Sequence, residues 1–212
     1  MKAHEGDAVL LLHGLWMNHF VMSPLAAGLK QAGYLPSLLD YRSMRGTVAE
    51  HLQQIEQRMT ALPGSRVHLI GHSMGGVLAL AWLARQSAQV RIGRTVLLGA
   101  PVRKCQAAQD FSQSAVGRWM LGESIELWRE PPALAIPPGR DVGAIAGTHA
   151  FGLGPLFVHL DGRNDGVVQV EETRIPGLAD HIELPVSHTG MLFSAEVVQM
   201  CVAFLQRGRF HS

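Results

Sequence analysis

Cysteine is scarce in this chain, which has only two such residues, Cys105 and Cys201, among 212. Small secreted domains that depend on disulfides are far richer in cysteine, so both residues are expected to be free thiols in a reducing compartment. The chain also has no apolar run close to the roughly 18 residues that a membrane-spanning helix needs. Its first apolar run, 8–12, comes too late and is too short for a signal peptide. These absences predict a cytoplasmic protein.

An excess of charge of either sign is also missing, since 18 basic and 17 acidic residues give a net charge of +1. Nucleic-acid-binding domains concentrate Lys and Arg on one face, and no such run occurs, so nucleic acid is not an expected partner. Hydrophobic residues make up 47% of the sequence and charged residues 17%. This composition suffices for one full-sized core, and a chain of this length is too short for two. We therefore predict a single domain over residues 1–212.

Short apolar runs alternate with helix-like segments along the chain. The apolar runs are typical of strands that are buried on both faces of a sheet, and they cover residues 8–12, 35–41, 67–70, 95–98, 142–146, 156–160 and 181–184. Helical patterns cover residues 24–32, 48–62, 75–86 and 195–206, the last with Ser194 as N-cap. Strands that alternate with helices form parallel βαβ units. The sequence therefore predicts an α/β fold with a mostly parallel central sheet flanked by helices.

One stretch, residues 101–140, departs from this alternation. It contains five of the eleven prolines together with Trp119 and Trp128, and it has no strand pattern. It follows the expected strand 95–98 and so begins at the edge of the sheet where ligands bind. We predict a short insertion within the single domain that acts as a cap over the site.

The segment Gly71-His72-Ser73-Met74-Gly75 matches the pattern G-x-S-x-G between an apolar strand and an apolar helix. In this pattern a sharp turn exposes the serine hydroxyl at the N-terminus of the helix, and the glycines allow close packing. Glycine also marks ordinary turns, which is the alternative interpretation. The strand before the motif and the uninterrupted helix after it favour Ser73 as a nucleophile.

A serine hydroxyl is a weak nucleophile at neutral pH and needs a histidine as base, oriented by a carboxylate. Of the 11 histidines, His188 follows the last expected strand, at the sheet edge where ligand-binding loops gather. His72 is adjacent to Ser73 and is expected to point elsewhere on so tight a turn. His188 is therefore the predicted base.

Two aspartates, Asp161 and Asp165, lie between the serine and the histidine in the sequence, after the expected strand 156–160. The same segment matches part of the calcium-binding EF-hand pattern, at Asp161, Asp165, Gly166 and Glu172. Arg163 occupies a ligand position of that pattern, and its positive charge disfavours a cation. We predict no metal and no cofactor.

These segments together resemble the α/β-hydrolase family, in particular its small bacterial lipases and esterases. The resemblance extends from about residue 8 to residue 206 in the family's order of Ser, Asp and His, and it is carried by His13-Gly14, the motif around Ser73, residues 162–168 and Ser187-His188. It implies a minimal α/β-hydrolase fold with a Ser73, His188 and Asp triad. In such lipases the acid precedes the histidine by about two dozen residues, and Asp165 lies 23 residues before His188, so the resemblance favours Asp165 over Asp161.

Attack on a carbonyl builds negative charge on oxygen, which fixed backbone N–H groups stabilise. Met74 follows the nucleophile at the helix N-terminus, and Leu15 follows His13-Gly14, so their N–H groups are the expected oxyanion hole, with Trp16 as the alternative to Leu15. A plain glycine turn is the other interpretation of the loop at residues 13–16. Nearby apolar residues either wall an acyl pocket or pack as core, namely Trp16, Met17, Phe20, Met191, Leu192 and Phe193.

The predicted function is a serine hydrolase, lipase-like or esterase-like, that cleaves carboxylic esters with an apolar acyl part through an acyl-enzyme. Its expected partner is a small-molecule ester or a lipid, and the sequence leaves peripheral membrane contact and the oligomeric state open. A thioesterase, an amidase or an acyltransferase would use the same residues. A non-catalytic ligand-binding protein is the alternative from a different class, because a fold alone does not establish function.

Overall fold

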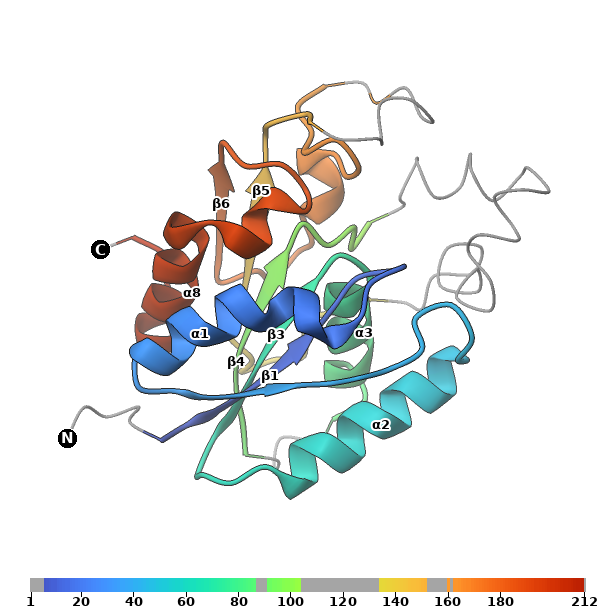
Figure 1. Cartoon of the computed structure of the whole chain (residues 1–212), viewed down its shortest axis with the longest axis vertical. Coiled ribbons are helices and arrows are strands. Elements are labelled where there is room, and N and C mark those ends of the chain that lie inside the picture. The colour runs from blue at the N-terminus through green and yellow to red at the C-terminus, as the bar shows by residue number, and fades with distance from the viewer. Residues whose placement is uncertain (1–5, 87–90, 104–133, 152–159, 161, 212) are drawn as a thin grey trace.

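Six strands form one parallel sheet in the computed structural model, which describes residues 6–86, 91–103, 134–151, 160 and 162–211 (Figure 1). The strands are ordered β2-β1-β3-β4-β5-β6, and each neighbouring pair is parallel. Their bounds are β1 Ala8–Leu12, β2 Leu35–Leu38, β3 Val67–His72, β4 Ile92–Leu98, β5 Val142–Gly147 and β6 Asp180–Leu184. The α-helices are α1 Ser23–Gln31, α2 Val48–Ala61, α3 Met74–Leu83 and α8 Ala195–Arg207, and the 3-10 helices are η1 His19–Met22, η3 Val170–Thr173 and η4 Gly190–Phe193. The predicted α/β class is confirmed.

Six of the seven predicted strands are present, with bounds that differ by a few residues. β2 ends at Leu38 and not at residue 41, because its pairing with β1 stops at Leu11 and Leu38. α3 ends at Leu83 and not at residue 86. The seventh predicted strand, 156–160, lies outside the described residues except for Leu160, which is not in a strand. Residues 104–133 of the predicted insertion also lie outside them.

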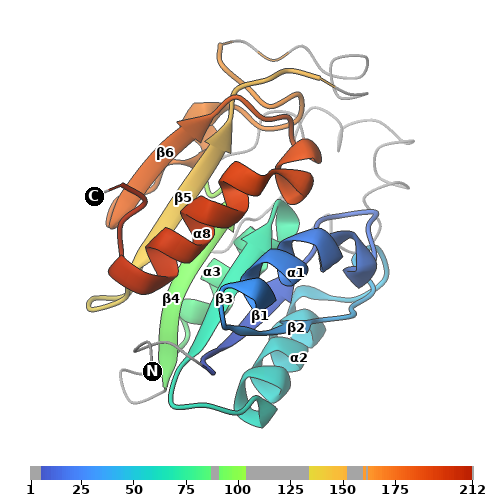
Figure 2. The same ribbon diagram turned by 60° about the vertical axis from the view of Figure 1, so that its left-hand side comes forward.

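The helices cover the two faces of the sheet in pairs (Figure 2). Ala8, Leu10 and Leu12 of β1 pack in a core cluster that includes residues of α2 and α3. Val9 and Leu11 belong to a second cluster with residues of α1 and α8. Successive side chains of a strand point to opposite faces, so a central strand covered on both sides must be apolar at every position. This explains the unbroken run of five apolar residues in β1.

Capping residues define the ends of two helices. Ser194, the predicted N-cap of the last helix, is confirmed, since its Oγ accepts a hydrogen bond of 3.3 Å from the N–H of Val197. Thr47 begins α2 with a capping box, in which its Oγ1 accepts from the N–H of Glu50 at 3.2 Å and the Glu50 carboxylate accepts from the N–H of Thr47 at 2.8 Å. These bonds satisfy N–H groups that the first turn of a helix leaves without intrahelical partners.

The order of the strands reverses direction at β1, which lies between β2 and β3. In an open parallel sheet such a reversal separates the connecting loops and leaves a crevice at the carboxyl ends of the strands. β1 and β3 pair in register as far as Leu12 and Gly71. The loop that begins at His13 therefore lies beside the turn that carries Ser73.

Candidate active site

Ser73 occupies a strained turn between β3 and α3. Its backbone has φ 53° and ψ −124°, and within the described part of the chain Trp16 is the one other non-glycine residue with positive φ. Positive φ is costly for a residue with a side chain and persists where the surrounding structure enforces it, often at functional sites. The N–H of Ser73 donates to the carbonyl oxygen of Leu98 in β4 at 2.9 Å. The turn therefore presents Ser73 at the carboxyl edge of the sheet, as a nucleophile elbow does.

Two glycines of the motif permit the tight turn because a side chain at either position would meet backbone atoms. A Cβ at Gly71 would lie 2.5 Å from the carbonyl carbon of Gly75. A Cβ at Gly75 would lie 2.5 Å from the carbonyl oxygen of His13. Both distances are too short for a real carbon atom. The pattern of glycines thus reflects close packing of α3 against β3 and β1.

Asp165 and His188 form a buried pair. The Nδ1 of His188 lies 2.7 Å from Oδ2 of Asp165, and the backbone N–H of His188 donates to the carbonyl oxygen of Asp165 at 2.9 Å. The other carboxylate oxygen, Oδ1, accepts from the N–H groups of Val167 at 2.9 Å and Val168 at 2.8 Å. Because a carboxylate accepts, the proton of the neutral imidazole sits on Nδ1, which leaves Nε2 free to act as a base. Asp161, the other predicted candidate, lies outside the described residues.

Several contacts bring the Asp165 and His188 pair to the same sheet edge as Ser73. The rings of His72 and His188 are 4.7 Å apart between centroids. Gly99, which follows the Leu98 carbonyl that Ser73 contacts, has φ 53°, and a Cβ there would lie 3.0 Å from Oδ2 of Asp165. The structure thus gathers the three predicted residues at the carboxyl ends of β3, β4 and β5.

His72 provides a link that the sequence did not reveal. Its side chain is fully buried, and its Nε2 lies 2.9 Å from the backbone carbonyl oxygen of His188. Burial, with a smaller contribution from His188, lowers the pKa of His72 to about 3, so the ring is neutral at physiological pH and donates through Nε2–H. The two residues are 116 positions apart, so no local pattern could have indicated their contact.

The two predicted oxyanion donors flank Ser73. Met74 begins α3, and Gly14, which precedes Leu15, packs so close that a Cβ on it would lie 3.2 Å from Cβ of Ser73. Within the described part of the chain, neither the N–H of Leu15 nor that of Met74 has a backbone acceptor. Two unpaired N–H groups beside a serine provide the kind of site that stabilises an oxyanion.

A sequence profile described as the alpha/beta hydrolase family matches residues 9–195. The chain belongs to the α/β-hydrolase family. The matched residues include Ser73, Asp165 and His188 as well as the loop at His13 and Gly14. The resemblance inferred from these segments of the sequence is therefore confirmed at the level of the family.

Solved structures of hydrolases share the fold of this α/β-hydrolase. The mature lipase BlEst2 of Bacillus licheniformis aligns with a TM-score of 0.71 at 16% identity, over 96% of this chain and 92% of that one. The metagenomic carboxyl esterase MGS0156 aligns with a TM-score of 0.68 at 18% identity, over 88% of this chain and 66% of that one. The pyrethroid hydrolase PytH aligns with a TM-score of 0.66 at 14% identity, over 95% and 98%. No protein of curated function matches the sequence at a significant level.

The residues predicted to bind substrate differ in exposure. Trp16 and Phe20 are 52% and 69% exposed, and Met17 is half-buried beside Gly14. Met191 is fully buried in the core cluster on the α1 and α8 face. Its Cε would lie 3.0 Å from a Cβ at Gly99, so Met191 packs beneath the His188 and Asp165 pair. Of these four residues, the structure leaves Trp16 and Phe20 most accessible to a substrate.

The calcium alternative finds little support among the described residues. Oδ1 of Asp165 is held by two N–H groups and Oδ2 by His188, and Glu172 accepts from the N–H of Gln169 at 2.8 Å. Arg163 forms an ion pair with Glu183. No three His, Cys, Asp or Glu side chains in the described ranges are grouped as metal ligands would be.

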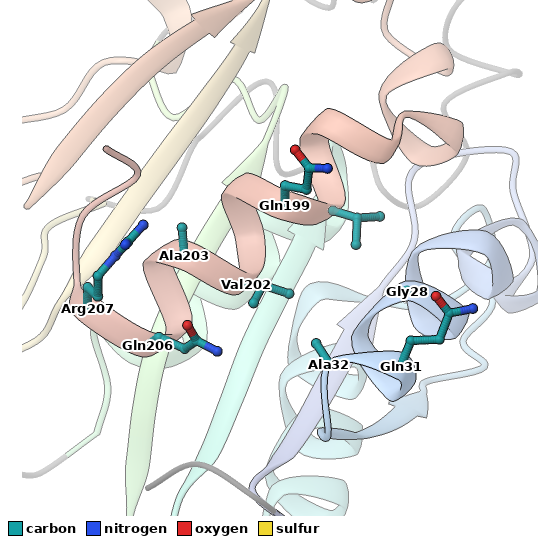
Figure 3. A pocket seen from close by; sticks show the side chains of 9 residues that line it. Gly28, Gln31, Ala32, Gln199, Val202, Ala203, Gln206 and Arg207 are labelled. Atoms are coloured by element: carbon teal, nitrogen blue, oxygen red, sulfur yellow. The ribbon is translucent and has the colours of Figure 1, made fainter. Parts of the chain in front are cut away.

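A shallow groove of about 450 Å³ lies between α1 and α8, away from the elbow (Figure 3). Gly28, Gln31 and Ala32 line one side, and Val198, Val202 and Gln206 are among the residues of the other. It includes none of the residues that surround Ser73, and it offers one positive charge, from Arg207, with no nucleophile. The groove is thus separate from the candidate active site.

Proposed function

We propose that this α/β-hydrolase is a serine hydrolase that cleaves carboxylic esters with an apolar acyl part. The observation that carries the proposal is the strained Ser73 beside a buried His188 and Asp165 pair, with two N–H groups close to the serine that have no backbone acceptor among the described residues. This combination of nucleophile, oriented base and oxyanion donors is the machinery of acyl transfer. No cofactor or metal takes part in the proposed reaction.

The first half of the reaction forms an acyl-enzyme. Oγ of Ser73 attacks the ester carbonyl carbon while Nε2 of His188 accepts the hydroxyl proton. The carbonyl oxygen becomes an oxyanion, which the N–H groups of Leu15 and Met74 stabilise. The intermediate collapses when the bond to the leaving oxygen breaks, and the imidazolium returns its proton to that oxygen. The products of this half are the free alcohol and an acyl group on Ser73.

The second half repeats these steps with water as nucleophile. His188 takes a proton from the water as it attacks the acyl carbon, and then gives that proton to Oγ of Ser73 as the acyl bond breaks. The released carboxylic acid and the regenerated serine complete the cycle. Asp165 is held in place by the N–H groups of Val167 and Val168, so it keeps the imidazole in one tautomer and stabilises its charged form.

Exposed apolar side chains support the choice of an apolar acyl group. Of the six exposed large hydrophobic residues in the described part of the chain, five follow the strands or turns of the site, namely Trp16, Phe20, Phe151, Val167 and Phe193. Contiguous exposed apolar patches often mark ligand or interface sites, and we propose that these side chains contribute to such a patch beside Ser73. Solved structures of similar fold include a lipase, a carboxyl esterase and a pyrethroid hydrolase, all of which have names that imply hydrolysis.

The location of the protein in the cell is a further part of the proposal. Within the described ranges, no helix combines the length and the apolar character that crossing a bilayer requires. We propose a cytoplasmic enzyme that meets its ester as a dissolved small molecule or by peripheral contact with a lipid surface.

Two experiments test the proposal. One measures hydrolysis of a panel of p-nitrophenyl esters from acetate to palmitate, and the other measures covalent labelling of the protein by a fluorophosphonate. We expect hydrolysis with a preference among the acyl chains and stoichiometric labelling of Ser73, identified by peptide mass spectrometry. Adding an alcohol as acceptor separates an acyltransferase from a hydrolase, and matching thioesters and amides separate the other leaving groups. A folded protein that neither labels nor hydrolyses any of these substrates would support the non-catalytic alternative.

A further inference from the structure

Two buried aromatic side chains bind successive carbonyl groups of the loop that follows β1. The hydroxyl of Tyr41 donates to the backbone carbonyl oxygen of His13. Nδ1 of His13 lies 2.9 Å from the carbonyl oxygen of Gly14. Tyr41 is 5% exposed and His13 is fully buried, so solvent does not compete for either bond. The orientation of both peptide groups is therefore fixed by side chains and not by a regular element.

The two rings also fix each other. The His13 and Tyr41 rings are stacked with centroids 4.2 Å apart and an interplanar angle of 16°, and His51 packs edge-on against Tyr41 at 5.0 Å. Burial lowers the pKa of His13 and raises the pKa of Tyr41. Both side chains are therefore neutral at physiological pH. Since a carbonyl oxygen only accepts, the single imidazole proton of His13 sits on Nδ1.

The bond to Gly14 determines where the next N–H points. The carbonyl of Gly14 and the N–H of Leu15 belong to one planar trans peptide, in which they point in opposite directions. Holding the carbonyl against the His13 ring turns the Leu15 N–H away from that ring. This peptide lies beside the nucleophile, because Gly14 packs against Cβ of Ser73.

We propose that Tyr41 and His13 are positioning residues for the oxyanion hole, which fix the peptide planes of the loop so that the Leu15 N–H is aimed at the developing oxyanion. The inference rests on the proposed serine hydrolase function. Neither side chain touches the reacting atoms. Their effect is to hold the donor in place before the reaction, which matters because small displacements of a preorganised donor cost much of its contribution to the rate.

The test compares two substrates that differ in one atom. In O-(p-nitrophenyl) thionobutyrate a sulfur replaces the carbonyl oxygen of p-nitrophenyl butyrate, and sulfur is a larger and weaker acceptor that gains less from donors placed for oxygen. The ratio of kcat/KM for the oxygen ester to that for the thionoester therefore measures the fit of the oxyanion hole. Tyr41→Phe keeps the ring and its stacking but removes the hydroxyl. We expect kcat for the oxygen ester to fall about 10- to 100-fold with little change in KM, and the ratio to fall about 10-fold.

Tyr34→Phe is the matched control, because Tyr34 is the other tyrosine of the chain and is also buried, but it precedes β2 at the opposite end of the sheet, near His68. It removes a buried hydroxyl and is expected to lower Tm without a change in the ratio. If Tyr41→Phe keeps the wild-type ratio and lowers Tm as Tyr34→Phe does, Tyr41 is only structural and the proposal is wrong.

A second pair of variants covers the case in which Tyr41→Phe does not fold. The side-chain amide of His13→Asn places a donor close to the position of Nδ1, whereas His13→Leu has none. The proposal requires the Asn variant to retain a higher ratio than the Leu variant, and equal ratios contradict it. If the wild-type protein hydrolyses neither ester, the proposed function fails and the oxyanion assignment fails with it. Hydrolysis by the wild type with unchanged ratios in the variants overturns the positioning role alone.

Discussion

Nε2 of His72 lies 2.9 Å from the backbone carbonyl oxygen of His188, so the residue before the nucleophile holds the loop that carries the base. The ring of His72 is fully buried and neutral, which makes this an ordinary donor bond with no competing water. The separation between Ser73 and His188 thus depends on a direct contact between their two chain segments.

Removing this donor should impair both catalysis and stability. We expect His72→Leu to lower kcat about 10²-fold, because the base is displaced from the serine, and to lower the free energy of unfolding by about 1 to 3 kcal/mol, because the His188 carbonyl loses its partner. His72→Gln, which keeps an amide donor, should recover part of the activity. Ester hydrolysis and urea unfolding on both variants provide the measurement. A stability loss with wild-type kcat in His72→Leu would mean that the contact is only structural.

The strain at Ser73 predicts that two equally inactive variants differ in stability. Ser73→Ala and Ser73→Gly should both lose at least about 10³-fold in kcat and all fluorophosphonate labelling, because the nucleophile is gone. With φ at 53°, Ala keeps the unfavourable backbone conformation, whereas Gly relieves it. Ser73→Gly should therefore melt at a higher temperature than Ser73→Ala, as measured by calorimetry. Residual labelling of Ser73→Ala at the wild-type rate would exclude Ser73 as the nucleophile.

Local patterns predicted most of the sheet and the helices because burial on two faces leaves a clear signal. The run of β1 and the N-cap at Ser194 are examples. The start of β4 was missed, since it begins at Ile92 and not at residue 95. Gly93 lies in the missed part of the strand, where a Cβ would lie 2.5 Å from Nδ1 of the His68 ring, so only glycine fits against that ring. The 3-10 helices η1, η3 and η4 are too short to show a period and were not predicted.

The residues of the candidate site that belong to a local sequence motif could be predicted, and the contacts between distant segments could not. Ser73 is marked by its glycines, His188 by its place after the last expected strand, and Asp165 by the family resemblance. The contacts of His72 with His188 and of Tyr41 with His13 join segments that the fold alone brings together, 116 and 28 positions apart. The Tyr41 and His13 pair follows from the pairing of β2 with β1, and the His72 and His188 pair joins the end of β3 to the loop after β6; a single sequence does not contain this arrangement.

Buried neutral histidines predict a loss of stability in mild acid. Burial lowers the pKa of His68 to about 4 and that of His72 to about 3, against an ordinary value of 6.5 in the unfolded chain. Below pH about 6.5 the unfolded state binds protons at these histidines and the folded state does not. The stability that is present above this pH is therefore lost as the pH falls, down to about 4 for His68 and about 3 for His72. Each histidine contributes up to about 1.4 kcal/mol per pH unit within its window.

His68→Asn tests this dependence away from the site. The Asn side-chain oxygen can replace Nδ1 of His68 as acceptor for the N–H of Arg94, a bond of 2.9 Å. We expect the slope of unfolding free energy against pH, measured with urea between pH 4.5 and 6.5 in steps of about half a unit, to decrease in this variant by up to about 1.4 kcal/mol per pH unit. An unchanged slope would show that His68 is protonated in the folded protein or is not a source of the acid sensitivity.

The last prediction concerns the carboxylate that orients His188. Asp165 contacts Nδ1 of His188 at 2.7 Å through one oxygen, while two backbone N–H groups hold its other oxygen. Asp165→Asn can retain the loop bonds through its amide oxygen, but its NH2 group then faces Nδ1 and favours the tautomer with the proton on Nε2, which cannot accept the proton of Ser73. We expect kcat to fall on the order of 10⁴-fold with a smaller change in Tm. Asp161→Asn is the matched control in the same segment, and because the family resemblance favours Asp165, it should keep kcat within about a few-fold of the wild type. Melting temperature and kcat are measured on both variants, with and without calcium. An inactive Asp161→Asn beside an active Asp165→Asn would reverse the assignment, and rescue of either variant's Tm by calcium would support a metal-binding loop instead.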